Sequence, residues 1–241
     1  MSQLQILWQN DEYIVVDKPS GMLTIPDRFD MSVPSLLSLL RREFESIYTV
    51  HRIDRDTSGC VLFAKNADAH RHASQLFESR QVKKHYRAIV HSNPHTPHGD
   101  IDAAIAEHPT IKGKMIVHAK LGKPALTSYT LLKSYGMYSL VDFLIHTGRT
   151  HQIRVHAQHL GFPVLCDPLY GDGKPFFVST IKKKYKLSKQ EEQERPLLQR
   201  LALHAYSLEL VDAHGLLIQV QSPLYKDMQA VCNQLDKIYS K

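Results

Sequence analysis

Strand-like segments separated by very short turns constrain the fold of this chain more than any other feature. Two apolar runs, 126–135 and 138–146, flank Gly136, and two further runs, 201–211 and 216–221, are separated by a short turn containing glycine. Such turns join antiparallel neighbours, because a parallel pair needs a crossover of a dozen or more residues. The pattern therefore argues against a purely parallel α/β sheet.

Other segments predict helices interspersed with strands. The stretch 91–123, rich in Pro and His, is expected to be loop-rich and the least regular part of the fold. The remaining predicted elements are a hairpin over 6–8 and 13–16, a helix from Pro34 with Leu36, Leu37, Leu40 and Phe44 on one face, a strand over 60–64, a helix over 66–80 capped by Asn66 or Asp68, a strand over 86–90, and helices over 150–160 and 226–239. Together they predict the α+β class, with a mixed, mainly antiparallel sheet and flanking helices.

Composition narrows the class of protein. Of 241 residues, 43% are hydrophobic and 22% are charged, as in ordinary globular proteins. Cys60, Cys166 and Cys232 are odd in number and far apart, which excludes a disulfide framework and a cysteine zinc knuckle. Apolar runs such as 60–64 are far shorter than the ~20 residues of a membrane span, and acidic residues interrupt the early apolar stretch. We expect a cytoplasmic protein that does not enter a membrane.

The charge balance favours a polyanionic partner. Lys and Arg number 30 against 24 Asp and Glu, a formal net charge of +6. Six basic and three acidic residues fall within 182–195, inside a charged insertion at about 178–198. This stretch is either a solvated surface loop or an element that follows a phosphate backbone, and we favour the solvated loop.

One polar loop, residues 51–59, carries a candidate reacting group. It reads His-Arg-Ile-Asp-Arg-Asp-Thr-Ser-Gly, which places Asp54 between Arg52 and Arg55. Neighbouring positive charge favours an ionised carboxylate, which can act as a nucleophile or a base. The alternative is that Asp54 only hydrogen-bonds the backbone of its own loop. Ser58 is a weaker candidate nucleophile, because the loop lacks the Gly-x-Ser-x-Gly pattern.

A second stretch, residues 147–159, combines basic residues with several histidines. His156 and His159 share one face of the expected helix and, with His151, form the alternative of a zinc-dependent hydrolase. No carboxylate or cysteine stands at metal-ligand spacing, so satisfied or surface histidines are favoured. The Gly148-Arg149-Thr150 segment at the helix start is a candidate phosphate-binding site.

Taken together, these stretches resemble the RluA-type pseudouridine synthases. The loop at 51–59 is similar to the family motif His-Arg-Leu-Asp-x-x-Thr-Ser-Gly, and the segment 147–156 resembles the family's later motif. Further matches in family order are found at 16–23, 84–88, 161–163, 167–171 and 200–205. The matches span most of the chain, and the resemblance implies a single pseudouridine synthase catalytic domain over residues 1–241.

The resemblance implies an isomerase that converts specific uridines to pseudouridine in structured RNA, in a ribosomal RNA or tRNA stem-loop, without cofactor or metal. Asp54 would attack the ribose C1′ atom or abstract the C2′ proton, Arg154 would pair with Asp54, and Tyr86 would stack on the uracil. Arg52 would fill the gap left by the flipped nucleotide. The expected RNA contacts are Arg52, Arg55, Lys84, Arg149 and His151.

From the residues alone, Tyr86 also fits a core strand aromatic and Arg154 a surface salt bridge. The departures from the family pattern are mild: Ile53 replaces Leu, Cys60 follows Gly59, and Cys166 precedes Asp167. The chain begins at the catalytic domain without the S4-type domain of many relatives, so we expect its own loops to select the RNA. We also expect a monomer. A non-catalytic RNA-binding or chaperone protein on the same fold is the alternative function.

Overall fold

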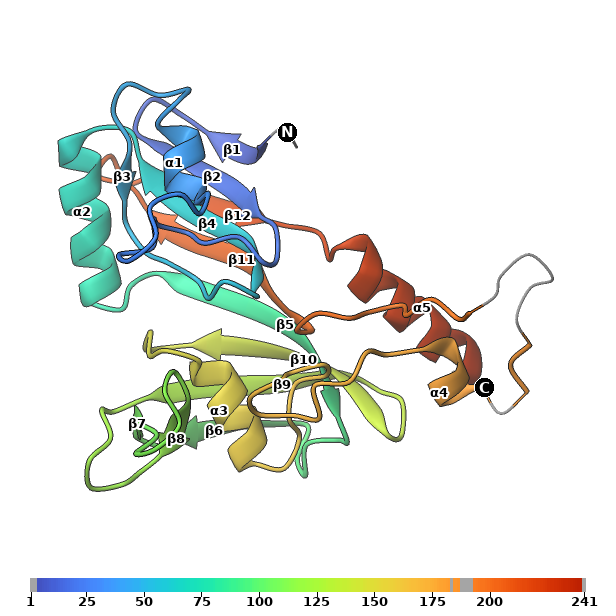
Figure 1. The fold of residues 1–241 in the computed structure, drawn as a ribbon. Helices are drawn as coiled ribbons and strands as arrows, with labels where there is room; N and C mark the ends of the chain where they lie inside the picture. Colours follow the sequence, from blue (N-terminus) through green and yellow to red (C-terminus); the bar gives the residue numbers. More distant parts are fainter. Residues whose placement is uncertain (1–3, 183, 187–192, 240–241) are drawn as a thin grey trace. The chain divides into compact units, whose positions relative to one another are not determined.

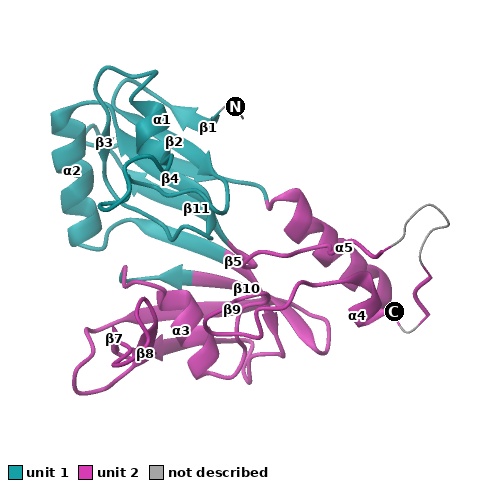
Figure 2. Ribbon diagram, viewed as in Figure 1, with its two compact units in different colours: residues 1–86, 144–147, 204–223 teal, residues 87–143, 148–203, 224–241 magenta. Residues whose placement is uncertain are grey.

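The computed structural model describes residues 4–182, 184–186 and 193–239, and Figure 1 gives its elements. They form two compact units, coloured teal and magenta in Figure 2. Unit 1 consists of residues 1–86, 144–147 and 204–223, and unit 2 of residues 87–143, 148–203 and 224–241. The single catalytic domain expected over 1–241 remains a prediction.

Unit 1 is built on a mixed sheet. The hairpin of β1 (Gln5–Gln9) and β2 (Tyr13–Lys18) pairs through β2 with antiparallel β4 (Ser58–Ala64). β4 is parallel to β11 (Leu203–Val211), which pairs with antiparallel β12 (Leu217–Gln221), and the short β3 (Tyr48–Thr49) adds to β4. Every residue of β2 and β4 is buried, so these two strands form the centre of the unit.

Two helices complete unit 1. α2 (Ala67–Glu78) packs beside β3 and β4 and begins at Asn66, whose side chain accepts the backbone N–H of Ala69. α1 (Leu36–Leu40) begins at Ser35 in a capping box with Ser38. α1 ends at Leu40, so the prediction that this helix extends to Phe44 is wrong.

Unit 2 contains the second group of strands. β5 (Lys83–His91) begins in unit 1 and continues into unit 2, where the strand order is β5, β10 (Tyr138–Ile145), β9 (Leu126–Ser134) and β6 (His98–Asp102). β7 (Ile105–Glu107) and β8 (Met115–Val117) form a separate hairpin. The helices of this unit are α3 (Gln152–His159), α4 (Val178–Ile181) and α5 (Lys226–Tyr239).

The predicted α+β class is confirmed, as are the hairpins around Gly136, the N-terminal hairpin and the C-terminal helix. The prediction that 91–123 is loop-rich is confirmed, and the stretch also contains β6, β7 and β8, which are strands of only three to five residues. Within the expected insertion, α4 forms its beginning, whereas residues 183 and 187–192 lie outside the described residues. Across the residues that the structure describes, no helix is long and apolar enough to span a membrane.

Candidate active site

A buried lysine holds the polar loop of unit 1 in place. Lys18, at the end of β2, is 0% exposed, and its Nζ donates to the carbonyl oxygens of Pro19, Met22 and Arg55 at 3.0, 2.7 and 2.8 Å. The Gly21 N–H donates to the same Arg55 carbonyl at 2.9 Å. The backbone immediately after Asp54 is therefore fixed to the segment that follows β2.

The backbone immediately before Asp54 is fixed as well. The Thr24 hydroxyl donates to the Ile53 carbonyl at 3.1 Å and accepts the Ile53 N–H at 3.3 Å. The Asp54 carbonyl accepts the Thr57 N–H, which closes a turn. Within the described part of unit 1, no hydrogen bond reaches the half-buried Asp54 carboxylate. The structure therefore does not support the alternative that this carboxylate caps its own loop.

His51 ties the start of the loop to β4 as a neutral ring. Its Nε2 accepts the Leu62 N–H at 2.9 Å, and its ring stacks on Phe77 with centroids 4.7 Å apart. Burial and then the charge of Lys84 lower the pKa of His51 to about 3. Lys84 lies over the same Phe77 ring at 5.1 Å and is only 9% exposed. Burial lowers the pKa of Lys84, and its side chain packs in the unit rather than on the surface.

Tyr86 and Asp54, 32 positions apart in the chain, both belong to unit 1, where the charge of Asp54 affects the pKa of Tyr86. Tyr86 lies on β5 and is 8% exposed. Burial first, and then the nearby Asp54 carboxylate and Cys60 side chain, raise the pKa of Tyr86. Unit 1 therefore contains both a carboxylate and a neutral aromatic ring.

The end of the loop is locked against β11. The Ser58 hydroxyl is buried and bonds to Nδ1 of His204 at 2.9 Å, whose Nε2 bonds to the Ser222 carbonyl at 3.0 Å. Gly59 has φ +111°, and a Cβ at this position would lie 2.2 Å from the Ala205 carbonyl oxygen. Only glycine permits this approach of β4 to β11, and the complete burial of Ser58 makes it a structural group.

In unit 2, Arg154 on α3 forms a buried ion pair with Asp167. Its Nε donates to Oδ2 at 2.7 Å and its Nη2 to Oδ1 at 2.8 Å, and the side chains are 3% and 0% exposed. Asp167 Oδ1 also accepts the backbone N–H groups of Leu169 and Tyr170. Asp167 thus orients Arg154. The pairing of Arg154 with Asp54, which the family resemblance implies, remains a prediction.

Tyr170 connects Arg154 with the surrounding loops of unit 2. The Arg154 guanidinium carbon lies 4.9 Å from the centroid of its ring, and its hydroxyl accepts the Met115 N–H at 2.7 Å. The same hydroxyl is 2.9 Å from Nδ1 of His151, the left-handed residue that precedes α3. Arg149 donates through Nε to the Pro124 carbonyl at 3.0 Å.

His156 on α3 is engaged in hydrogen bonds, whereas His159 at the end of the helix is exposed. His156 is 0% exposed, with Nδ1 bonded to the Thr127 hydroxyl and Nε2 to the Ala103 carbonyl, both at 2.9 Å. Burial lowers the pKa of His156. Among the described residues, no three His, Cys, Asp or Glu side chains gather as metal ligands. The contacts of His156 are therefore those of a satisfied core histidine.

Comparison with known proteins shows which family this chain belongs to. A family model described as RNA pseudouridylate synthase matches residues 12–159, which include Asp54, Tyr86 and Arg154. The ribosomal large subunit pseudouridine synthase D of Haemophilus ducreyi is 33% identical over 252 residues, covering 99% of this chain and 72% of that protein. The chain belongs to the RNA pseudouridylate synthase family.

Other members of the RNA pseudouridylate synthase family are also similar to this chain over most of its length. The ribosomal large subunit pseudouridine synthase D of Nitrosomonas europaea is 35% identical over 95% of this chain, which spans 64% of that relative's length. In the solved structure of human RNA pseudouridylate synthase domain containing 4, the match covers 96% of this chain and 92% of the human chain, at 27% identity and TM-score 0.73. The resemblance to RluA-type enzymes is confirmed.

Sequence reasoning missed three residues that position the family's motifs. Lys18, Asp167 and Tyr170 lie in matched segments, but no role was predicted for any of them. Their positions inside the matched motifs could have marked them as functional residues, but sequence spacing alone does not show which side chains they contact. Arg52 and Arg55 are exposed as expected of RNA contacts, although Arg55 Nε already donates to the Gly21 carbonyl at 3.0 Å.

Proposed function

We propose that this protein converts uridine to pseudouridine in RNA, with Asp54 as the reacting group. The observation that supports this most strongly is the interaction of Asp54 with Tyr86 in unit 1, inside the segment that matches the family. The loop around Asp54 is held by backbone contacts on both sides, which leaves the carboxylate to face a substrate.

The reaction rearranges atoms within one nucleotide. Asp54 attacks the ribose C1′ atom, or removes the C2′ proton, and the N1–C1′ bond breaks. The uracil turns and C5 bonds to C1′, while the Asp54–C1′ bond breaks or, in the second route, Asp54 returns its proton to C2′. The proton on C5 leaves and N1 gains a proton, so product and substrate have the same atoms. No oxidant or reductant enters this balance, and we propose that the enzyme needs neither cofactor nor metal.

Tyr86 presents a neutral ring to the flipped base. Its raised pKa keeps the phenol protonated at pH 7, so stacking rather than proton removal from C5 is its proposed role. Arg154, oriented by Asp167, is proposed to pair with Asp54 when substrate is bound. Arg52 fills the gap in the RNA stack, and Arg55, Arg149 and His151 contact the backbone, whereas the buried Lys84 side chain is not proposed as an RNA contact.

The substrate is proposed to be ribosomal RNA, because two of the relatives above are named for the ribosomal large subunit. A tRNA stem-loop is the second substrate to test. We propose that the protein acts on either RNA as a monomer in the cytoplasm.

Tritium release from RNA labelled at uridine C5 tests the proposal, because the C5 proton is lost in every turnover. Asp54→Asn should lower the release rate by at least about a hundredfold, as expected for loss of a reacting group. Asp56→Asn in the same loop is the matched control and should stay within about threefold, because only its backbone carbonyl is used, by the Ser20 hydroxyl. Equal release by wild type and Asp54→Asn would reject the mechanism, and RNA binding without release would favour the non-catalytic alternative.

A further inference from the structure

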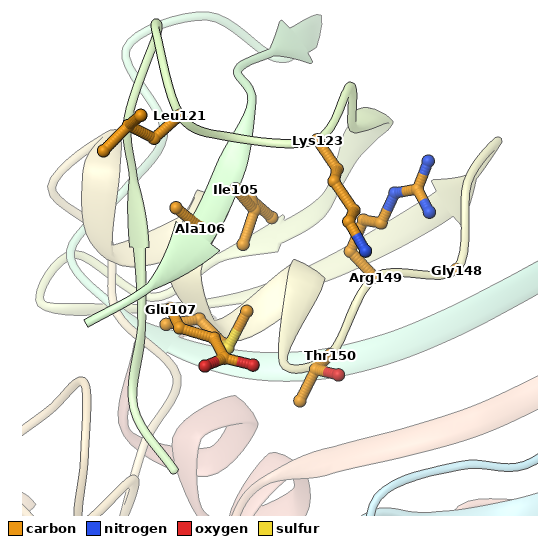
Figure 3. A pocket seen from close by; sticks show the side chains of 9 residues that line it. Ile105, Ala106, Glu107, Leu121, Lys123, Gly148, Arg149 and Thr150 are labelled. Atoms are coloured by element: carbon orange, nitrogen blue, oxygen red, sulfur yellow. The ribbon is translucent and has the colours of Figure 1, made fainter. Parts of the chain in front are cut away.

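Unit 2 contains a cavity of about 390 Å³, shown in Figure 3. Its volume falls in the range of about 300–1,000 Å³ that is typical of small-ligand sites, a size class that includes a nucleotide. Three segments line it: the β7–β8 hairpin through Ile105–Glu107 and Met115, the loop through Leu121 and Lys123, and the Gly148-Arg149-Thr150 segment before α3.

The cavity combines two cations, an apolar wall and a carboxylate. Figure 3 shows the Lys123 and Arg149 side chains near one another, with the Glu107 carboxylate at a different part of the lining. The bond from Arg149 Nε to Pro124 fixes the guanidinium beside the loop that carries Lys123. Neither Lys123 nor Glu107 forms an ion pair with another residue in the described part of the chain. Both charges are therefore available to a ligand.

The apolar wall is firmly supported. Ile105 is 2% exposed and packs in a cluster with Ala125, Val155 and Tyr170, against which Met115 also packs. The hydroxyl of Tyr170 accepts the Met115 N–H, and the ring of Tyr170 contacts Arg154. The cavity is therefore connected through one side chain to an arginine proposed to act at the target uridine.

We infer that this cavity binds one nucleotide of the substrate RNA close to the target uridine, with Lys123 and Arg149 on its phosphate and Glu107 on its base. The inference rests on the proposed function for the identity of the ligand as RNA. Phosphate is the group that paired Lys and Arg recognise best. The apolar wall offers a surface for a base that has left the stack.

Glu107 selects among the bases by hydrogen bonding. An ionised carboxylate only accepts, so it requires a base edge that presents donors. Guanine presents two neighbouring donors, N1–H and the N2 amino group, which match the two carboxylate oxygens. Uracil presents one N–H between two carbonyl oxygens that repel the carboxylate. Adenine and cytosine each present one amino donor beside a ring nitrogen whose lone pair repels the carboxylate, so the cavity is a guanine-selective subsite.

A stem-loop RNA pool tests this inference with the full-length protein. The pool carries one tritiated uridine and random nucleotides at the positions on either side. Wild type should enrich guanine at one fixed position, both among bound RNAs and among RNAs that release tritium. Glu107→Gln should reduce that enrichment about tenfold, whereas Glu45→Gln, an exposed glutamate of unit 1, should leave it unchanged.

Lys123 gives an independent readout. Lys123→Ala should weaken binding of all sequences about threefold to fivefold and lower the slope of log affinity against log salt by about 1. Lys120→Ala removes the same charge nearby from an exposed residue that does not line the cavity, and should change neither quantity.

The outcomes separate the subsite from the reaction. Guanine enrichment that is absent in wild type, or unchanged in Glu107→Gln, overturns the subsite even when tritium release depends on Asp54. Enrichment among bound RNAs that Glu107→Gln abolishes, with no tritium release by wild type, supports the subsite and overturns the proposed reaction.

Discussion

Neutralising Asp167 is expected to destabilise the protein strongly, because its partner is a buried arginine. Asp167 and Arg154 are 0% and 3% exposed and share two hydrogen bonds of 2.7 and 2.8 Å. In Asp167→Asn, one oxygen can still accept the N–H groups of Leu169 and Tyr170, but an amide replaces the charge facing the guanidinium. Breaking a buried pair by altering one partner costs about 3–5 kcal/mol, a large part of a typical stability of about 5–15 kcal/mol.

Urea unfolding measures this loss, followed by circular dichroism and analysed at a common m-value. Asp68→Asn is the control, since it breaks the exposed pair with Arg71, whose side chains are 88% and 69% exposed. Exposed pairs contribute about 0–1 kcal/mol. A loss below about 1 kcal/mol for Asp167→Asn would refute the assignment of Asp167 as the residue that holds Arg154.

The double variant Arg154→Met/Asp167→Asn separates stability from reaction. It leaves no unpaired buried charge and keeps an acceptor for the backbone N–H groups, so it should recover about 2 kcal/mol relative to Asp167→Asn. Tritium release should remain lost, because the guanidinium is gone. Recovered stability with wild-type release would show that Arg154 has no part in the reaction.

Three further predictions concern the loop around Asp54. Lys18→Met leaves the carbonyl oxygens of Pro19 and Met22 unsatisfied at about 1–3 kcal/mol each, whereas the Arg55 carbonyl keeps the Gly21 N–H. Urea unfolding should therefore show a loss of several kcal/mol; a loss under about 1 kcal/mol would contradict the anchoring role. Gly59→Ala forces a Cβ to within 2.2 Å of the Ala205 oxygen and should abolish soluble folded protein on gel filtration, whereas Gly21→Ala, also at positive φ but in open space, should cost about 1–2 kcal/mol. Folding lowers the pKa of His51 from 6.5 to about 3, so between these pH values the unfolded chain binds a proton at His51 that the folded chain does not bind. The contribution of His51 to the free energy of unfolding is therefore complete above pH 6.5 and decreases towards pH 3, by up to about 5 kcal/mol. His51→Gln should flatten that part of the stability–pH curve, and an unchanged curve would count against the neutral ring.

Much of the fold is readable from local sequence. The hairpins around Gly136 and at the N-terminus, and the helix Lys226–Tyr239, combine a clear apolar period with a turn or cap that ends it. The strands β6, β7 and β8 could not be predicted in this way, because each has three to five residues among prolines and glycines. Long-range pairing, such as that of β6 with β9, decides their conformation.

The candidate site was also only partly predictable, because local sequence patterns do not show which side chains meet over long distances in the chain. The motif pattern indicated Asp54 and Tyr86 as site residues, and both belong to unit 1, where the Asp54 charge helps to raise the pKa of Tyr86. It did not identify Asp167 as the partner of Arg154, 13 positions away, because two motifs that match a family in order do not reveal which side chains touch. Lys84 was predicted as an RNA contact from its charge, whereas packing on Phe77 buries it.

Buried polar residues in these motifs position the groups that face the substrate. Lys18 binds the backbone carbonyl next to Asp54, His51 binds the strand that follows the loop, and Asp167 binds Arg154. A change at any of these three should lower stability and tritium release together, because each leaves a buried partner unsatisfied. A change at Asp54, whose carboxylate has no hydrogen bond within the described part of unit 1, should lower release alone. Measuring both quantities on one set of variants therefore distinguishes the reacting carboxylate from the residues that hold it in place.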